Sequence, residues 1–173
     1  MFTKTDIEKY FVAEKSESLL FMIIGAAAII LAIVFFFFLK TNWHKGASIP
    51  FFVIGILHLV IGYTVYNRSD ADRLQNVYAY DMNPDALKTK EIPRMETVNK
   101  NFVIYRYTEI VLLLAGVGLF FYFKNNVSKS FWVGLGLALA IEAAVSLGAD
   151  YFAEARAKVY TKGLKEFTAM KTK

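Results

Sequence analysis

The chain has 173 residues, of which 56% are hydrophobic, and this excludes an ordinary soluble domain of that length. It contains no cysteine, which excludes disulfides, thiolate metal sites, iron–sulfur clusters and thiol nucleophiles. The formal net charge of +5 does not point to nucleic acid, because in a chain this apolar the positions of the basic residues matter more than their sum.

The hydrophobic residues are gathered into four segments. The first, residues 19–39, is a run of 21 residues without a charged side chain. At about 1.5 Å per residue, such a helix crosses a hydrocarbon core of about 30 Å. Glu14 and Glu17 precede this run and no A-x-A site follows it, so we interpret it as a retained helix rather than a cleaved signal peptide. The other three runs cover residues 48–66, 107–123 and 131–149.

These runs predict an all-α integral membrane protein with four transmembrane helices in one domain, residues 1–173. The segments between the first and second runs and between the third and fourth are short, so we expect two antiparallel hairpins. The connector 67–106 and the tail 150–173 are rich in charged residues. We expect the helices to continue through them as a stalk outside the membrane.

The basic residues predict the orientation. Three precede the first run, seven lie in the connector and six in the tail, against two in each short segment. By the positive-inside rule, both termini and the stalk are cytoplasmic and the protein is integral to the plasma (inner) membrane. Trp43 and Trp132 then fall at the outer ends of spans.

Local signals indicate where the helices begin. Thr5 followed by Glu8 is a possible capping box for the first helix. Ser48 and Pro50 indicate the opening of the second span, and Pro93 fits the first turn of the helix that enters the third.

One residue is out of place in a purely structural span. Glu142 lies near the middle of the fourth run, where a charged side chain costs at least about 2.5 kcal/mol. At steps of four residues, its helix carries small and polar side chains at Gly134, Ala138, Ser146 and Asp150. This stripe predicts close helix packing around a carboxyl group that needs partners.

The other helices offer those partners. His58 is central in the second run, and Arg106 and Glu109 share a stripe of the third helix with Asn99. The first helix brings Glu17. Together they predict a polar pocket that faces the cytoplasm, with an intramembrane polar site made of Glu142, His58, Glu109, Arg106, Ser146 and Glu17.

Several interpretations of this site remain open. The polar residues could act only as interhelical glue, with Arg106 and Glu109 paired within their own helix. They could instead form a site for a proton or small cation, because a carboxyl group in a low dielectric can load and release a proton that an imidazole relays. A di-metal centre is disfavoured because the Glu-x-x-His pairs of such bundles do not occur in the sequence.

The sequence therefore predicts a small membrane protein that moves protons or small cations, or binds a ligand, in a cytoplasm-facing pocket. We expect no enzymatic activity, because no catalytic motif is recognisable, and no cofactor and no nucleic acid. The expected partners are the lipid bilayer and either further copies in a homo-oligomer or a partner membrane protein. The alternative is a structural or accessory subunit of a larger membrane complex.

Overall fold

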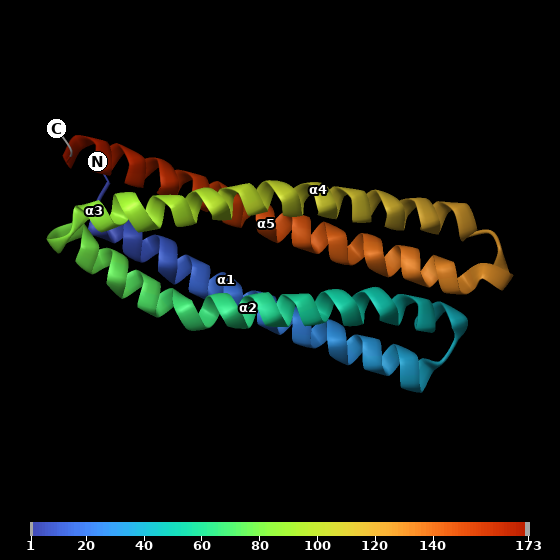
Figure 1. Ribbon diagram of the computed structural model, residues 1–173. Helices are drawn as coiled ribbons and strands as arrows, with labels where there is room; N and C mark the ends of the chain where they lie inside the picture. Colours follow the sequence, from blue (N-terminus) through green and yellow to red (C-terminus); the bar gives the residue numbers. More distant parts are fainter. Residues whose placement is uncertain (1, 172–173) are drawn as a thin grey trace.

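The structure, a computed structural model, describes residues 2–171 (Figure 1). Residue 1 and residues 172–173, the ends of the predicted domain, lie outside the described residues. All assigned elements are helical: α1 Lys4–Ile33, the π-helix η1 Val34–Leu39, α2 Asn42–Met82, α3 Pro84–Ala86, the π-helix η2 Leu87–Glu91, α4 Ile92–Phe123, the 3₁₀-helix η3 Val127–Lys129, and α5 Ser130–Lys171.

Four of the resulting helical units are long and apolar enough to cross a membrane, as the sequence predicts. They are α1 with η1, α2, α3 through α4, and η3 with α5. Helix α2 alone has 41 residues, which corresponds to about 60 Å, roughly twice the thickness of a hydrocarbon core. Each unit therefore extends well beyond its apolar run.

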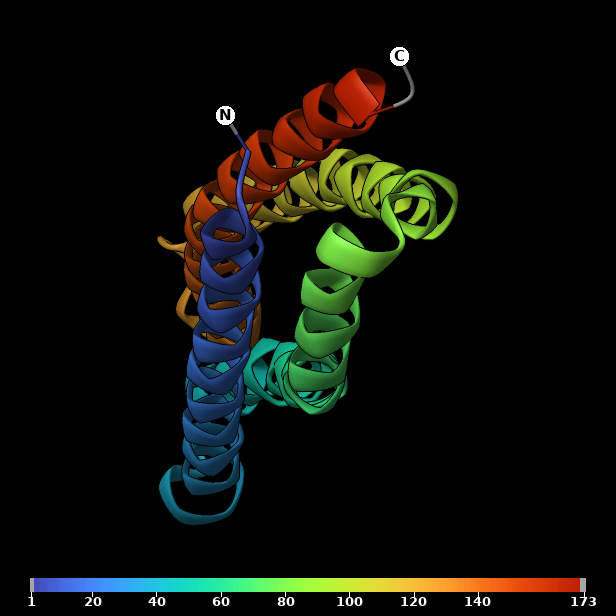
Figure 2. The ribbon, with the colours of Figure 1, turned by 90° about the vertical axis from the view of Figure 1, so that its left-hand side faces the viewer.

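The helices pack mainly as two neighbouring pairs (Figure 1). Helix α1 lies along α2, and α4 lies along α5. A contact between α2 and α5 joins the pairs, so that α1 and α4 are the outer helices. Figure 2, viewed from the end that holds both termini, shows α1 and α5 meeting there as well.

The predicted capping box at Thr5 is wrong, and the second helix begins before the predicted opening of its span. α1 begins earlier, at a capping box in which the Thr3 backbone N–H donates to Asp6 Oδ2 at 2.8 Å. α2 begins at Asn42, where the Thr41 hydroxyl accepts from the His44 backbone N–H, and Pro50 lies inside the helix. In α2 the polar first turn precedes the apolar pattern, whereas the cap of α1 differs from the predicted one by only two residues. The prediction that Pro93 lies in the first turn of α4 is confirmed.

The main hydrophobic core lies at the end of the bundle that holds both termini and the α2–α3 corner. We call this the polar end, and all four long helices contribute to the core there. It includes two stacked ring pairs, Tyr10 with Tyr160 at 4.1 Å between centroids and Tyr80 with Phe167 at 4.4 Å. We call this cluster the aromatic core; its buried members are Phe2, Ile7, Tyr10, Phe11, Ala79, Leu87, Met95, Ala157, Tyr160, Leu164 and Phe167.

The apolar segments pack differently, through glycines that bring backbones together. A Cβ atom at Gly134 of α5 would lie 2.0 Å from the backbone oxygen of Trp43 in α2. A Cβ atom at Gly46 would lie 1.9 Å from the backbone oxygen of Phe131. Similar approaches join α1 to α2 at Gly25 and Gly55, and α4 to α5 at Gly116 and Gly136. The predicted small-residue stripe of α5 thus meets α2 at Gly134.

Candidate functional site: a polar ladder on α5

Glu142 is buried in the apolar part of α5. Its exposed fraction is 4%, and its Oε2 atom has no hydrogen-bond partner. Buried polar atoms are nearly always paired, so an unpaired carboxyl oxygen calls for an explanation.

A hydrogen bond between α2 and α5 lies one helical turn from Glu142. His58 Nε2 and Ser146 Oγ are 3.0 Å apart and both side chains are buried. The other ring nitrogen, His58 Nδ1, is buried without a partner, and the ring of Phe21 packs edge-on against the imidazole at 5.1 Å. Ser146 follows Glu142 by four residues, on the same helix face. The structure thus places Glu142, Ser146 and His58 in one region.

Glu109 and Arg106 face α5 as well, but nearer the polar end. The carboxyl group of Glu109 lies beside that of Asp150 in α5, and its Oε2 atom is buried without a hydrogen-bond partner. Asp150 lies eight residues from Glu142, about 12 Å along the helix axis. These two residues of α4 therefore do not surround Glu142.

The expected ion pair between Arg106 and Glu109 is wrong. Arg106 Nη1 instead donates to both carboxylate oxygens of Glu154 in α5, at 3.2 and 3.3 Å. The predicted stripe of α4 explains this, because Asn99 on the same stripe donates to Thr161 of α5 at 2.8 Å. This face of α4 is turned toward α5, so its polar side chains bond to residues of α5 and not to residues of their own helix.

Polar groups follow one another along α5 at steps of four residues. We call them the polar ladder: Glu142, Ser146, Asp150 and Glu154. Its partners change with depth, from His58 of α2 to Glu109 and Arg106 of α4. Glu154 was not predicted, although it continues the same spacing past the end of the apolar run.

Glu17 lies apart from this ladder. Its two carboxylate oxygens accept hydrogen bonds from Arg156 of α5, whose guanidinium also lies 5.9 Å from the ring centroid of Tyr10. Arg156 is fourteen residues beyond Glu142 along α5. Glu17 therefore belongs to the polar end of the bundle and not to the surroundings of Glu142.

The polar end contains a second buried network that sequence analysis missed. The carboxylate of Glu91 is 4% exposed and accepts from Arg94 Nε at 2.7 Å, from Arg94 Nη2 at 2.6 Å and from the Tyr160 hydroxyl at 3.2 Å. Burial, followed by the charge of Glu91, raises the pKa of Tyr160 above its ordinary value. This network sits against the aromatic core.

Comparisons with protein-family models, with curated proteins and with solved structures gave no match to this chain. Within the described residues, no group of three or more His, Asp or Glu side chains is arranged to hold a metal ion. The ladder offers instead a series of separate carboxyl and imidazole sites. Such groups can bind protons and pass them between neighbours.

Proposed function

We propose that this chain is a four-span protein of the plasma (inner) membrane whose polar ladder binds protons that enter from the cytoplasm. Both termini and the α2–α3 corner lie at one end of the bundle (Figure 1). The three segments at that end carry sixteen of the twenty Lys and Arg residues, which supports a cytoplasmic location. The pairs α1–α2 and α4–α5 would be the membrane hairpins, and the aromatic core would lie in the cytoplasmic stalk.

One observation carries the proposal: Glu142 has a buried, unpaired carboxyl oxygen one turn from the His58–Ser146 hydrogen bond. An ionised carboxylate at membrane depth is costly, whereas a protonated carboxyl group needs only one acceptor and gives up its charge. The imidazole of His58 has a second buried nitrogen without a partner, and it can accept a proton there.

The donor set suits a proton better than a metal cation. A cation such as Ca²⁺ takes six to eight oxygen ligands, whereas successive positions of the ladder are about 6 Å apart along the axis. The closeness of the Glu109 and Asp150 carboxyl groups points the same way. Two neighbouring carboxylates repel each other, and a proton on one of them removes that repulsion.

Access to Glu142 would come from one side. Toward the cytoplasm, the ladder continues through Ser146 and Asp150 to Glu154. In the opposite direction the same face carries Ala138 and Gly134, and the Gly134 backbone packs on α2. Movement of protons to the outer side would then need a route between copies of the chain, so we propose a homo-oligomer.

The test is proton flux into sealed liposomes that contain the purified protein, with alkali-cation gradients measured separately. We expect flux from the wild type, none from Glu142→Gln, and wild-type flux from the control Glu96→Gln. Glu96 is an exposed residue of α4 paired with Lys165, and its loss leaves the ladder intact. Flux from Glu142→Gln equal to that of the control would contradict the proposal.

A second candidate is an accessory subunit of a larger membrane complex, in which the ladder only fixes helix register. The surface of α4 favours it: within Ile92–Phe123, all of which is described, only Met95 and Gly116 are buried. A partner protein could cover that surface. In this case no variant shows flux, Glu142→Gln alters only heat stability, and a partner co-purifies from native membranes.

A further inference from the structure

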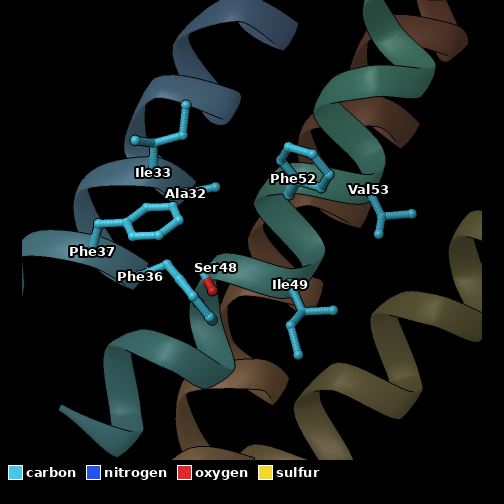
Figure 3. Close-up of a pocket in the computed structure, with 8 residues that line it drawn as sticks. All are labelled: Ala32, Ile33, Phe36, Phe37, Ser48, Ile49, Phe52 and Val53. Atoms are coloured by element: carbon cyan, nitrogen blue, oxygen red, sulfur yellow. The ribbon is translucent and has the colours of Figure 1, made fainter. Parts of the chain in front are cut away.

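The π-helix η1 and the start of α2 enclose an apolar groove that the polar ladder does not use. Its volume is about 260 Å³. Figure 3 shows its two walls, one from α1 and η1 and the other from α2. The lining residues are Ala32, Ile33, Phe36, Phe37, Ser48, Ile49, Phe52 and Val53. π-Helical segments are rare and often lie at functional sites.

The groove has no free side-chain hydrogen-bond donor for water. Its one polar side chain, Ser48, already donates its hydroxyl proton to the backbone oxygen of Lys45 at 2.8 Å. Apolar cavities smaller than this one stay dry and accept hydrocarbon. The groove is also open along its rim, where Phe37, Phe52 and Val53 are about half exposed. In a membrane, that rim meets lipid.

Positive charge stands at one end of the groove. Lys40 directly follows η1, and Lys45 lies one turn before Ile49; both lysines are exposed. The sequence from Lys40 to Pro50 contains no acidic residue that could neutralise them. At the edge of a membrane, such a pair attracts the phosphate of a lipid headgroup.

We propose that this groove binds one acyl chain of an anionic phospholipid, with the headgroup phosphate at Lys40 and Lys45. The inference rests on the membrane location proposed above but not on proton binding. A hydrocarbon chain fills the apolar walls, and the two lysines select the negatively charged headgroup. The lipid would belong to the leaflet at the end opposite the aromatic core.

Native mass spectrometry of protein extracted from vesicles of equal parts phosphatidylglycerol and phosphatidylcholine tests the site. We expect one retained phospholipid, with phosphatidylglycerol favoured by about fivefold for each lysine. Val53→Trp fills the groove from its rim and should abolish retention. The control Val60→Trp lies two turns along the same helix, is equally exposed (58% against 51% for Val53) and should retain the lipid.

Equal retention by the two tryptophan variants would overturn the proposal, as would an unchanged headgroup preference in Lys40→Gln/Lys45→Gln. All four substituted positions are exposed, so misfolding is not expected to imitate the result. Proton flux should be unaffected in Val53→Trp, and lipid retention should be unaffected in Glu142→Gln. Failure of the groove and failure of the ladder are therefore separate outcomes.

Discussion

The polar end and the apolar segments of this bundle are held together by different contacts. At the polar end, large side chains interlock: Phe11 and Leu164 are fully buried, and tyrosine rings stack between α1 and α5. In the apolar segments, the closest contacts are made by glycines whose backbones touch, as at Gly134 and Gly46. The same four helices thus use two packing rules.

The difference agrees with the membrane location that we propose for the apolar segments. In water, burying an aromatic side chain is favourable because apolar surface is removed from water. In lipid, a leucine gains nothing of this kind by moving from acyl chains to a neighbouring helix, so close van der Waals contact must hold the helices. The packing itself therefore supports a membrane around the apolar segments and water around the polar end.

Removing a large side chain from the aromatic core should have the largest effect. We expect Phe11→Ala to lower the free energy of unfolding by about 3–5 kcal/mol, because the cavity cannot close. Phe152→Ala, at a residue 68% exposed, should cost little. Heat unfolding in detergent micelles, followed by circular dichroism, measures both. Equal losses of stability in Phe11→Ala and Phe152→Ala would show that the aromatic core does not depend on its buried rings.

Adding one methyl group between α2 and α5 should cause the second-largest loss of stability. We expect Gly134→Ala to cost about 3 kcal/mol, the upper end of overpacking, because the new Cβ meets a backbone atom that cannot move aside. Gly118 and Gly148 have no atom within 4 Å of the same position. Alanine there should stabilise by up to about 1 kcal/mol through helix propensity. The same melting experiment compares the three, and destabilisation by all of them would contradict the packing argument.

Neutralising the buried carboxylate of the polar end should have a smaller effect. Glu91→Gln is expected to cost about 2 kcal/mol, since it removes the negative charge opposite Arg94 and replaces one of the two accepting oxygens with an amide donor. Glu96→Gln removes an exposed ion pair with Lys165 and should cost less than about 1 kcal/mol. Urea unfolding at low and high salt distinguishes them, because only the exposed pair is screened.

The smallest effect at neutral pH is expected for Tyr160→Phe, and its cost should decrease as the pH rises above 10. Burial raises the pKa values of Tyr10 and Tyr160 above the ordinary 10.0, with repulsion from Glu14 and Glu91 respectively adding to it. The folded state then holds the phenolic protons more tightly than the unfolded state. This stability is complete below pH 10 and is lost as the pH rises further.

Tyr160→Phe should cost about 1 kcal/mol at pH 7, the net value of its hydrogen bond to Glu91. Tyr10→Phe/Tyr160→Phe should flatten the fall of the melting temperature between pH 9 and pH 12. A double variant with the wild-type slope in that range would mean that other groups, such as the lysines, cause the alkaline loss.

Much of the fold follows from local sequence. The run of residues 19–39 and the three later runs predict four long apolar helices, and Gly134 of the predicted stripe lies where α5 touches α2. Helix starts at Thr3 and Thr41 were less predictable, because capping side chains precede the hydrophobic pattern.

The site was predictable only in part. Glu142 stands out in the sequence because a carboxyl group is costly inside an apolar helix, and Ser146 follows from helix periodicity. The partnership of Arg106 with Glu154 was not predictable, because Glu109 is the nearer carboxylate along the chain. The sequence alone does not distinguish an ion pair within one helix from an ion pair between two helices.

The sequence by itself determined the number of long apolar helices, the small-residue stripe of α5 and the isolated carboxyl group at Glu142. These features depend on composition and on the period of the α-helix, which are local. Only the tertiary structure decided that His58 meets Ser146, that Glu17 pairs with Arg156 and that the main core lies at the polar end. Those contacts depend on how far each helix is rotated and shifted against its neighbours, and no single helix contains that information.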